Sequence, residues 1–178
     1  FYNEKPVTAI GAKAFFDCTE ITSVTVPKGV EEIGDEAFYN CRNLVTLKLP
    51  ETVAAIGREA FSLCKKLSDI TLPSGECEIN QGAFTGCDVL RKVKLPGGTT
   101  DLTEMFYGCD SLETVILPEG LSEIGQFAFY YCTSLKTIVI PENVDTISPD
   151  AFYDSALETV YGYGGSAAKK FAENNGLG

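Results

Sequence analysis

The hydrophobic pattern of this chain recurs at intervals of 23 residues, with one interval of 22. Phenylalanine marks each recurrence, at Phe15, Phe38, Phe61, Phe84, Phe106, Phe129 and Phe152. Cysteine follows three positions after each of the first six phenylalanines, and Ser155 takes that position in the seventh copy. Copies held in register in this way predict repeats that stack along one axis and share a continuous core.

Each repeat contains a phrase that predicts one short strand. Leu44, Leu47 and Leu49 form an L-x-x-L-x-L phrase whose last part alternates with period two, as in a half-buried strand. Pro50 has no N–H to give to a sheet ladder, so the strand should end there. Stacking the phrases predicts a parallel sheet with one strand per coil. Ile56 predicts a second extended contact in each coil.

A tight turn is expected between that second contact and the phenylalanine. Gly57 permits a left-handed or tight backbone, and Asn80, its counterpart one coil later, tolerates the same geometry. Ala60 and Phe61 are expected to begin a short helical turn that places the ring in the core. The rings should then stack as a spine. One coil cannot bury its apolar face alone, so neighbouring coils must share stability.

The pattern departs from regularity in the middle and at the C-terminal end. Glu76 and Thr99 occupy a position held by Val or Leu in other repeats, so the middle coils are expected to bulge or pack loosely. After Val160 the pattern breaks, and Ser166 can N-cap a helix that extends to about residue 174. With Gly176 as a C′ residue, this helix is expected to cap the last coil.

The phrase Ile-Gly-x-x-Ala-Phe-x-x-Cys-x-x-Leu-x-x-Leu-x-Leu-Pro, present at residues 33–50, resembles the repeat of BspA-like (Treponema-type) bacterial leucine-rich repeat proteins. The resemblance covers residues 7–178. It implies a leucine-rich repeat solenoid: a right-handed coil of about seven 23-residue repeats with short parallel strands, a turn-rich convex side and a C-terminal helical cap. Residues 1–178 would form a single domain, with repeats over 7–160 and the cap over 161–178.

The same resemblance implies secretion or display on a bacterial cell surface. It also implies a protein partner, such as a host matrix or plasma protein. The family shares no catalytic or ligand-binding residues, so none can be assigned here by resemblance. Met105 is the only methionine, and the chain is therefore expected to be part of a longer protein.

Composition and net charge argue against several classes of function. The chain has no histidine, which removes the commonest general base and most imidazole metal sites. Its net charge of −11 argues against binding to nucleic acid or anionic membranes, which requires clustered Lys and Arg. No apolar run approaches the roughly 20 residues that span a bilayer. We therefore expect a non-catalytic monomer without a cofactor.

The column of six cysteines could be interpreted as a set of disulfides or as a metal site, but the geometry expected for a parallel stack fits neither. Adjacent copies in a parallel stack lie about 4.8 Å apart with parallel Cβ vectors, whereas a disulfide needs Cβ atoms about 3.8 Å apart that point toward each other. Zinc needs four converging thiolates, and a ladder does not converge. Buried free thiols are favoured. Cys77 lies outside the column and is expected to be partly exposed.

A column of carboxylates at Glu78, Asp101 and Glu123 superficially matches the spacing of a glycosidase pair. The side of a solenoid offers no closed pocket to raise one carboxyl pKa, so a solvated acidic stripe is favoured. No catalytic residue is expected.

The outward residues of the strands form the candidate binding site. Two columns there combine positive charge with apolar side chains on an otherwise acidic chain, and concave solenoid faces commonly bind partners. The candidate residues are Lys48, Lys92, Lys94, Ile116, Val139 and Tyr161. Tyr161 could instead be covered by the cap helix. The chain is thus interpreted as a protein-binding or adhesion module.

The alternative is a carbohydrate-binding or spacer module attached to another domain. Just after the phenylalanine spine runs a second aromatic stripe, which includes Tyr39, Tyr107, Tyr130 and Tyr153. These rings could stack on sugars or could shield the edge of the core, and the shielding interpretation is favoured.

Overall fold

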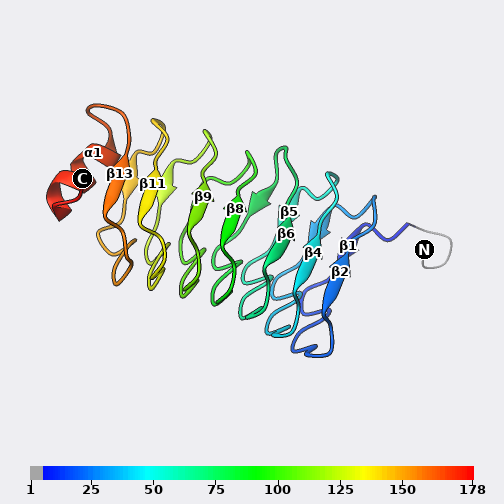
Figure 1. Ribbon diagram of the computed structural model, residues 1–178. Helices are drawn as coiled ribbons and strands as arrows, with labels where there is room; N and C mark the ends of the chain where they lie inside the picture. Colours follow the sequence, from blue (N-terminus) through cyan, green and yellow to red (C-terminus); the bar gives the residue numbers. More distant parts are fainter. Residues whose placement is uncertain (1–5) are drawn as a thin grey trace.

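The computed structural model describes residues 6–178 and shows a solenoid of stacked coils that ends in one helix (Figure 1). Most coils have a three-residue strand, a proline turn, a two-residue strand and a run of turns. In the coil after Pro96, an isolated bridge at Asp101 stands in place of the two-residue strand. The three-residue strands are β2 (Ser23–Thr25), β4 (Thr46–Lys48), β6 (Asp69–Thr71), β8 (Lys92–Lys94), β9 (Thr114–Ile116), β11 (Thr137–Val139) and β13 (Thr159–Tyr161). The two-residue strands are β1 (Ala9–Ile10), β3 (Glu32–Ile33), β5 (Ala55–Ile56), β7 (Glu78–Ile79), β10 (Glu123–Ile124) and β12 (Thr146–Ile147).

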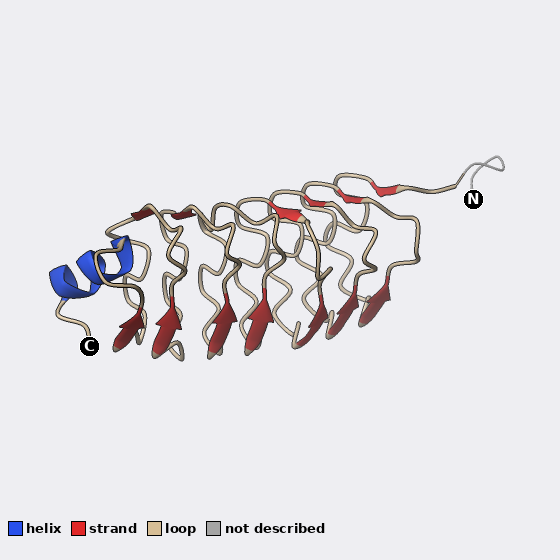
Figure 2. Ribbon diagram, turned by 90° about the horizontal axis from the view of Figure 1, so that it is seen from above, coloured by secondary structure: helices blue, strands red, loops and turns tan. Residues whose placement is uncertain are grey.

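The two kinds of strand form separate rows on opposite sides of the solenoid (Figure 2). Pairing is parallel and follows the repeat, so that Val24 lies opposite Leu47 and Leu47 lies opposite Ile70. In β8, β9 and β11 the middle side chain is buried and its two neighbours are exposed. The predicted strands, and the second extended contact at Ile56, are confirmed.

The row of three-residue strands is not one continuous sheet. It divides into β2-β4-β6, β8-β9 and β11-β13. We call the unpaired boundary between β6 and β8 the β6–β8 split; Figure 2 shows it as a wide space in the row of strands. The inward residues Ile70 and Leu72 are partly exposed beside this split, whereas Leu47 and Leu49, their equivalents one coil earlier, are buried. The looser packing expected in the middle of the chain is therefore present.

The proline turn after β6 also differs from the others. Elsewhere the residue three positions after the proline is buried, as at Val53 and Thr99. After Pro73 this position holds Glu76, which is exposed, and Cys77 is buried in its place. The expectation that Cys77 is partly exposed is wrong, because the thiol fills a core position that the charged Glu76 cannot occupy without desolvation.

The expected helical turn around each phenylalanine is also wrong. Around the first six phenylalanines the residues two positions before and after the ring have left-handed backbones; for example, Glu36 and Asn40 around Phe38 have φ of 53° and 56°. Alternate N–H groups bond within the coil and to the next coil: Ala37 donates to Gly34 O at 3.2 Å, and Phe38 donates to Ala60 O at 2.8 Å. A helix would use these N–H groups internally, so the turns replace it in order to join the coils.

Gly57 serves a different purpose from the one predicted. Its φ does not lie in the left-handed region, but a Cβ atom there would lie 2.5 Å from the Asp35 backbone nitrogen and side-chain Oδ1. Glycine therefore permits close approach between successive coils. Asn80 also lacks a left-handed backbone, and its side-chain amide donates to Ile56 O at 3.1 Å.

The phenylalanine spine is confirmed. Its rings stack nearly parallel, with centroid separations from 4.9 Å for Phe15–Phe38 to 5.9 Å for Phe84–Phe106. At the first coil Phe15 is 38% exposed, whereas Phe61 in the middle of the spine is fully buried. Burial therefore depends on having a neighbouring coil on each side.

The last coil is covered by the cap helix α1 (Ala167–Asn175). Ser166 N-caps this helix by accepting a hydrogen bond from the Lys169 N–H at 3.4 Å. Gly176 ends it in a left-handed conformation with φ of 65°, and the Leu177 N–H donates to Ala172 O at 3.0 Å. Phe171 packs against Phe152, with ring centroids 5.4 Å apart. The predicted cap, including its N-cap and C′ residues, is confirmed.

Candidate binding face

The outward residues of the three-residue strands form a surface that we call the strand face. Because strand side chains alternate, the first and third residue of each strand point outward while the second enters the core. Most of these outward residues are exposed, including all six candidate residues predicted from the sequence. The strand face is therefore presented to solvent along the length of the solenoid.

An apolar column occupies its C-terminal half. Ile116, Val139 and Tyr161 are exposed by 43%, 64% and 58%, and Val139 lies directly opposite Tyr161 in the β11–β13 pair. Helix α1 does not cover Tyr161. Three consecutive exposed apolar side chains are uncommon on a sheet face that contacts only water, and such patches mark contact surfaces.

Lys94 continues this column toward the middle of the molecule, and Lys92 lies at the start of the same strand. Lys94 lies opposite Ile116, and Lys92 lies opposite Thr114. The adjacent Arg91 forms an ion pair with Glu113 at 3.0 Å, but no carboxylate among residues 6–178 comes within 4.0 Å of the Lys92 or Lys94 ammonium group. Their charge is consequently available to a partner.

Lys48 is not part of the same cluster. It pairs with Thr25 on one side and Thr71 on the other, so a whole strand and the β6–β8 split separate it from Lys94. The structure thus brings together five of the six predicted residues in the C-terminal part of the face and leaves Lys48 apart from them.

The β6–β8 split forms a groove of about 220 Å³ in the strand face. Four apolar residues line it, of which Ile70 and Leu72 are partly exposed while Val93 and Leu95 are buried, and Lys92 and Lys94 contribute positive charge. The repeat pattern does not predict this groove, because β6 and β8 each satisfy the strand pattern when taken alone.

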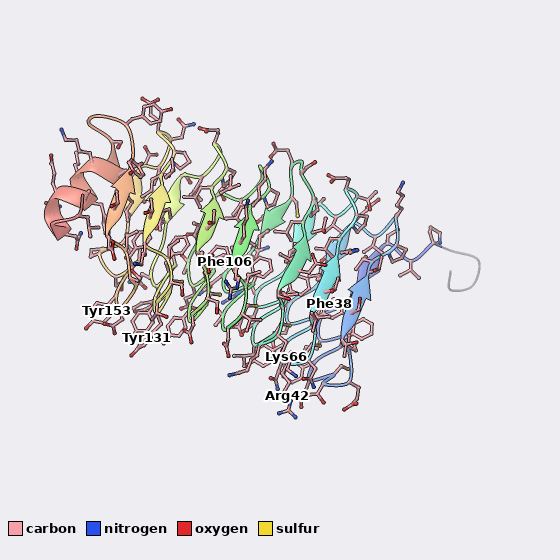
Figure 3. The ribbon with its side chains drawn as sticks, viewed as in Figure 1. Phe38, Arg42, Lys66, Phe106, Tyr131 and Tyr153 are labelled. Carbon is pink, nitrogen blue, oxygen red and sulfur yellow. The ribbon has the colours of Figure 1, made fainter. Side chains whose placement is uncertain are left out.

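A second exposed cluster lies on the turn edge, where Figure 3 shows Tyr131 and Tyr153. Tyr107, Tyr130 and Tyr153 stack in succession, with centroids 4.7 and 5.7 Å apart. The Phe127 ring meets the Tyr130 ring edge-on, with centroids 5.5 Å apart, and the Tyr131 ring is tilted against Tyr130, with centroids 4.8 Å apart. We call these five residues the aromatic edge.

Sequence reasoning missed Phe127 and Tyr131. Both have left-handed backbones, with φ of 54° and 57°, in columns that other coils fill mainly with polar residues or glycine. A bulky aromatic residue is unfavourable in this conformation, and such strain often marks a functional position. The signal available in the sequence was an aromatic residue in a column of charged residues and glycine.

The cysteine column forms hydrogen bonds rather than a reactive site. All seven cysteines are free thiols. Each buried column thiol donates to the carbonyl of a phenylalanine one coil earlier, for example from Cys64 Sγ to Phe38 O at 3.3 Å and from Cys109 Sγ to Phe84 O at 3.1 Å. Burial raises the pKa of Cys41 to about 11 and that of Cys132 to about 12. Such thiols are poor nucleophiles at neutral pH.

The acidic column does not form a uniform stripe. Asp101 pairs with Glu123 through an isolated β-bridge, while its Oδ1 accepts hydrogen bonds from the backbone N–H and hydroxyl of Thr103, both at 2.9 Å. These contacts hold Asp101 to its own turn.

Within residues 6–178, no group of three or more His, Cys, Asp or Glu side chains is arranged to hold a metal ion. In the same part of the chain, no helix has the length and apolar character needed to cross a bilayer.

Together, the repeated coil, the phenylalanine spine and the exposed strand face define a leucine-rich repeat protein. The chain belongs to the family described as BspA type leucine rich repeat region, which it matches over residues 2–105 and 77–166 with six copies. A comparison with curated proteins found no match.

Solved structures of bacterial proteins support this assignment. The chain is similar to a leucine-rich cell surface protein of Faecalibacterium prausnitzii, with 37% identity and a TM-score of 0.83 over 91% of this chain and 45% of that one. It is also similar to a leucine-rich repeat protein of Bacteroides ovatus, with 33% identity and a TM-score of 0.77 over 91% and 45%. A leucine-rich repeat protein of T. pallidum is 25% identical, with a TM-score of 0.72 over 98% and 79%.

The chain spans somewhat less than half the length of the first two of these proteins. The shared feature is therefore the repeat solenoid itself. Proteins built from such repeats generally serve as structural or interaction modules, because the extended face of a solenoid offers a large surface for contact.

Proposed function

We propose that this chain is a non-catalytic protein-binding or adhesion module of a secreted or cell-surface bacterial protein, and that it binds a protein partner through the strand face. The observation that carries this proposal is the exposed column of Ile116, Val139 and Tyr161 beside two lysines that form no ion pair within residues 6–178. The cell surface protein of Faecalibacterium prausnitzii supports the proposed location, since it shares this fold at 37% identity.

The two parts of the face would contribute differently to binding. The apolar column would supply the desolvated centre that keeps the complex together. Lys92 and Lys94 would accelerate encounter with an acidic surface, and this contribution would weaken as salt concentration rises. A host matrix or plasma protein is the proposed class of partner.

Surface plasmon resonance against a panel of purified host matrix and plasma proteins tests the proposal. The double variant Ile116→Asp/Val139→Asp should weaken binding of a panel member at least tenfold, about 1.4 kcal/mol. The matched control Thr8→Asp/Thr146→Asp adds the same charge at exposed positions in and beside the other row of strands and should bind like the parent. Equal weakening by both double variants would contradict a role for the strand face.

Carbohydrate binding is the second candidate, and the aromatic edge favours it. Tyr131 and Tyr153 are exposed by 47% and 60%, so neither serves only to shield the core. Tyrosine rings can stack on the apolar faces of sugars while their hydroxyls remain hydrated. Tyr131 is held in a left-handed backbone conformation that is costly for an aromatic residue.

A panel of soluble polysaccharides, followed by isothermal titration calorimetry, tests this candidate. Tyr131→Ala/Tyr153→Ala should abolish sugar binding, while Tyr39→Ala, in the same stripe but away from the cluster, should not. If neither polysaccharides nor proteins bind the parent chain, a spacer role is favoured.

A further inference from the structure

We infer that the β6–β8 split is a binding site for an extended, acidic segment of a protein partner, which lies along the split and hydrogen-bonds to its free strand edges. This inference deepens the proposed protein-binding function and rests on it. It names both the position of the contact and the chemistry of the bound segment.

Free backbone groups are the first support. Where successive strands are paired, the residue after the strand donates to the next strand, as from Leu49 N–H to Thr71 O at 3.0 Å and from Leu95 N–H to Ile116 O at 3.0 Å. Among the described residues, no equivalent bond joins Leu72 to Lys94. Unpaired strand edges readily accept another extended chain, because the new strand satisfies their N–H and C=O groups.

The apolar floor is the second support. Ile70 and Leu72 are partly exposed at the split, although the equivalent residues of later strands, such as Val93 and Leu95, are buried. The row of strands is also interrupted between β9 and β11, but Val115 remains buried there. At the β6–β8 split the interruption of this row coincides with a groove that is lined by Ile70 and Leu72.

Charge determines which segment fits. The ionisable side chains that line the groove are Lys92 and Lys94, and neither has an ion-pair partner among the described residues. They stand out on a chain that is strongly acidic as a whole, with a net charge of −11. An inserted strand with alternating residues would direct one set of side chains to the apolar floor and the other set toward the lysines. Acidic residues in the outward set would complement that charge.

The test uses three fluorescent peptides and the whole chain. The first peptide is acetyl-Glu-Val-Glu-Val-Glu-Val-Glu-amide, the second carries N-methyl groups on its valines, and the third carries them on its two central glutamates. N-methylation removes backbone donors from one edge of the peptide and leaves charge and side chains unchanged. Fluorescence anisotropy should show binding of the first peptide and at least a tenfold loss for one or both methylated peptides.

Location is tested with two matched lysine variants. Lys94→Glu should weaken binding of the first peptide at least tenfold, because it reverses a charge on the groove. Lys48→Glu makes the same change in the same column, but on a strand paired on both sides, and should alter binding less than threefold. Circular dichroism checks that both variants fold like the parent.

Hydrogen–deuterium exchange tests the split without relying on any one variant. In the free protein, amides of residues 69–72 should exchange faster than those of residues 46–49, and the first peptide should slow them. The inference is overturned if the two segments are equally protected before peptide is added, if all three peptides bind equally or none binds, or if both lysine variants weaken binding equally. A protein partner lost only on Ile116→Asp/Val139→Asp would then still support the proposed function.

Discussion

Truncation of Phe61 tests the shared core most directly. Phe61 is fully buried and stacks between Phe38 and Phe84, with centroids 5.5 and 5.7 Å away. Replacing a buried phenylalanine by alanine costs about 3–5 kcal/mol through lost burial and the cavity that remains. Two stacked neighbours place Phe61→Ala near the top of this range, at about 5 kcal/mol.

Phe15→Ala is the matched control, because it removes the same side chain from the same column. Phe15 is 38% exposed, and among residues 6–178 it stacks on Phe38 alone, so we expect a loss of about 1–2 kcal/mol. Urea unfolding followed by circular dichroism measures both changes in the free energy of unfolding. Equal losses from the two substitutions would refute the argument that burial depends on neighbouring coils.

The Phe61→Ala substitution should also have a local effect. The Cys87 thiol donates to Phe61 O at 3.4 Å, whereas Cys132, two coils further along, contacts Phe106 O at 3.2 Å. Mass-spectrometric thiol labelling should therefore accelerate at Cys87 more than at Cys132. Uniform acceleration along the solenoid would indicate that the coils open as one unit.

Three further results are expected. At pH 8 a thiol reagent should modify the half-buried Cys18 rapidly and the other six cysteines only on unfolding. Burial raises the pKa of thiols such as Cys41 to about 11 and leaves little thiolate to react. Rapid labelling of all seven cysteines would contradict this expectation. Gly57→Ala should destabilise the fold by about 2 kcal/mol in thermal unfolding, because its Cβ would lie 2.5 Å from Asp35 N. Gly11→Ala is the control in the same column; a Cβ there would meet no atom within 4 Å, so stability should change by under about 0.5 kcal/mol. Thr99→Val should raise the free energy of unfolding by about 1 kcal/mol, because the buried Thr99 hydroxyl has no hydrogen-bond partner among the described residues; a decrease would show that the hydroxyl is satisfied.

Features that depend on residue spacing alone were predictable from the sequence. The recurrence of phenylalanine gave the spine, the L-x-x-L-x-L phrase gave the strands, and Ser166 with Gly176 gave the cap. These features follow from which side chains need burial and which backbone groups need a partner. The outward position of the candidate residues followed from the same alternation.

Features that depend on contact between coils were not predictable. Gly57 was interpreted through its own backbone, although the constraint comes from Asp35 in the preceding coil. The pattern around Phe38 predicts a helical turn, because it does not show that alternate N–H groups bond to the next coil. Cys77 was placed by counting from Pro73, and counting does not reveal that the turn changes to keep Glu76 in water.

The candidate site was predicted in part for the same reason. Exposure of Ile116 and Val139 follows from the alternation within each strand. The separation of Lys48 from Lys94 depends on whether β6 and β8 pair, and both strands carry ordinary strand sequences. A periodic pattern shows which residues share a column but not where a sheet is interrupted.

The single 22-residue interval shows how this architecture absorbs a change in chain length. In that coil Leu102 fills the core position held by isoleucine elsewhere, and Met105 fills the alanine position; both are fully buried. Beyond the missing residue, Lys94 still pairs with Ile116, so the next strand keeps its register. The linking segment before each phenylalanine can therefore lose a residue during evolution while the strands of the strand face keep their register. Searches that require a strict 23-residue period would undercount the repeats in such arrays.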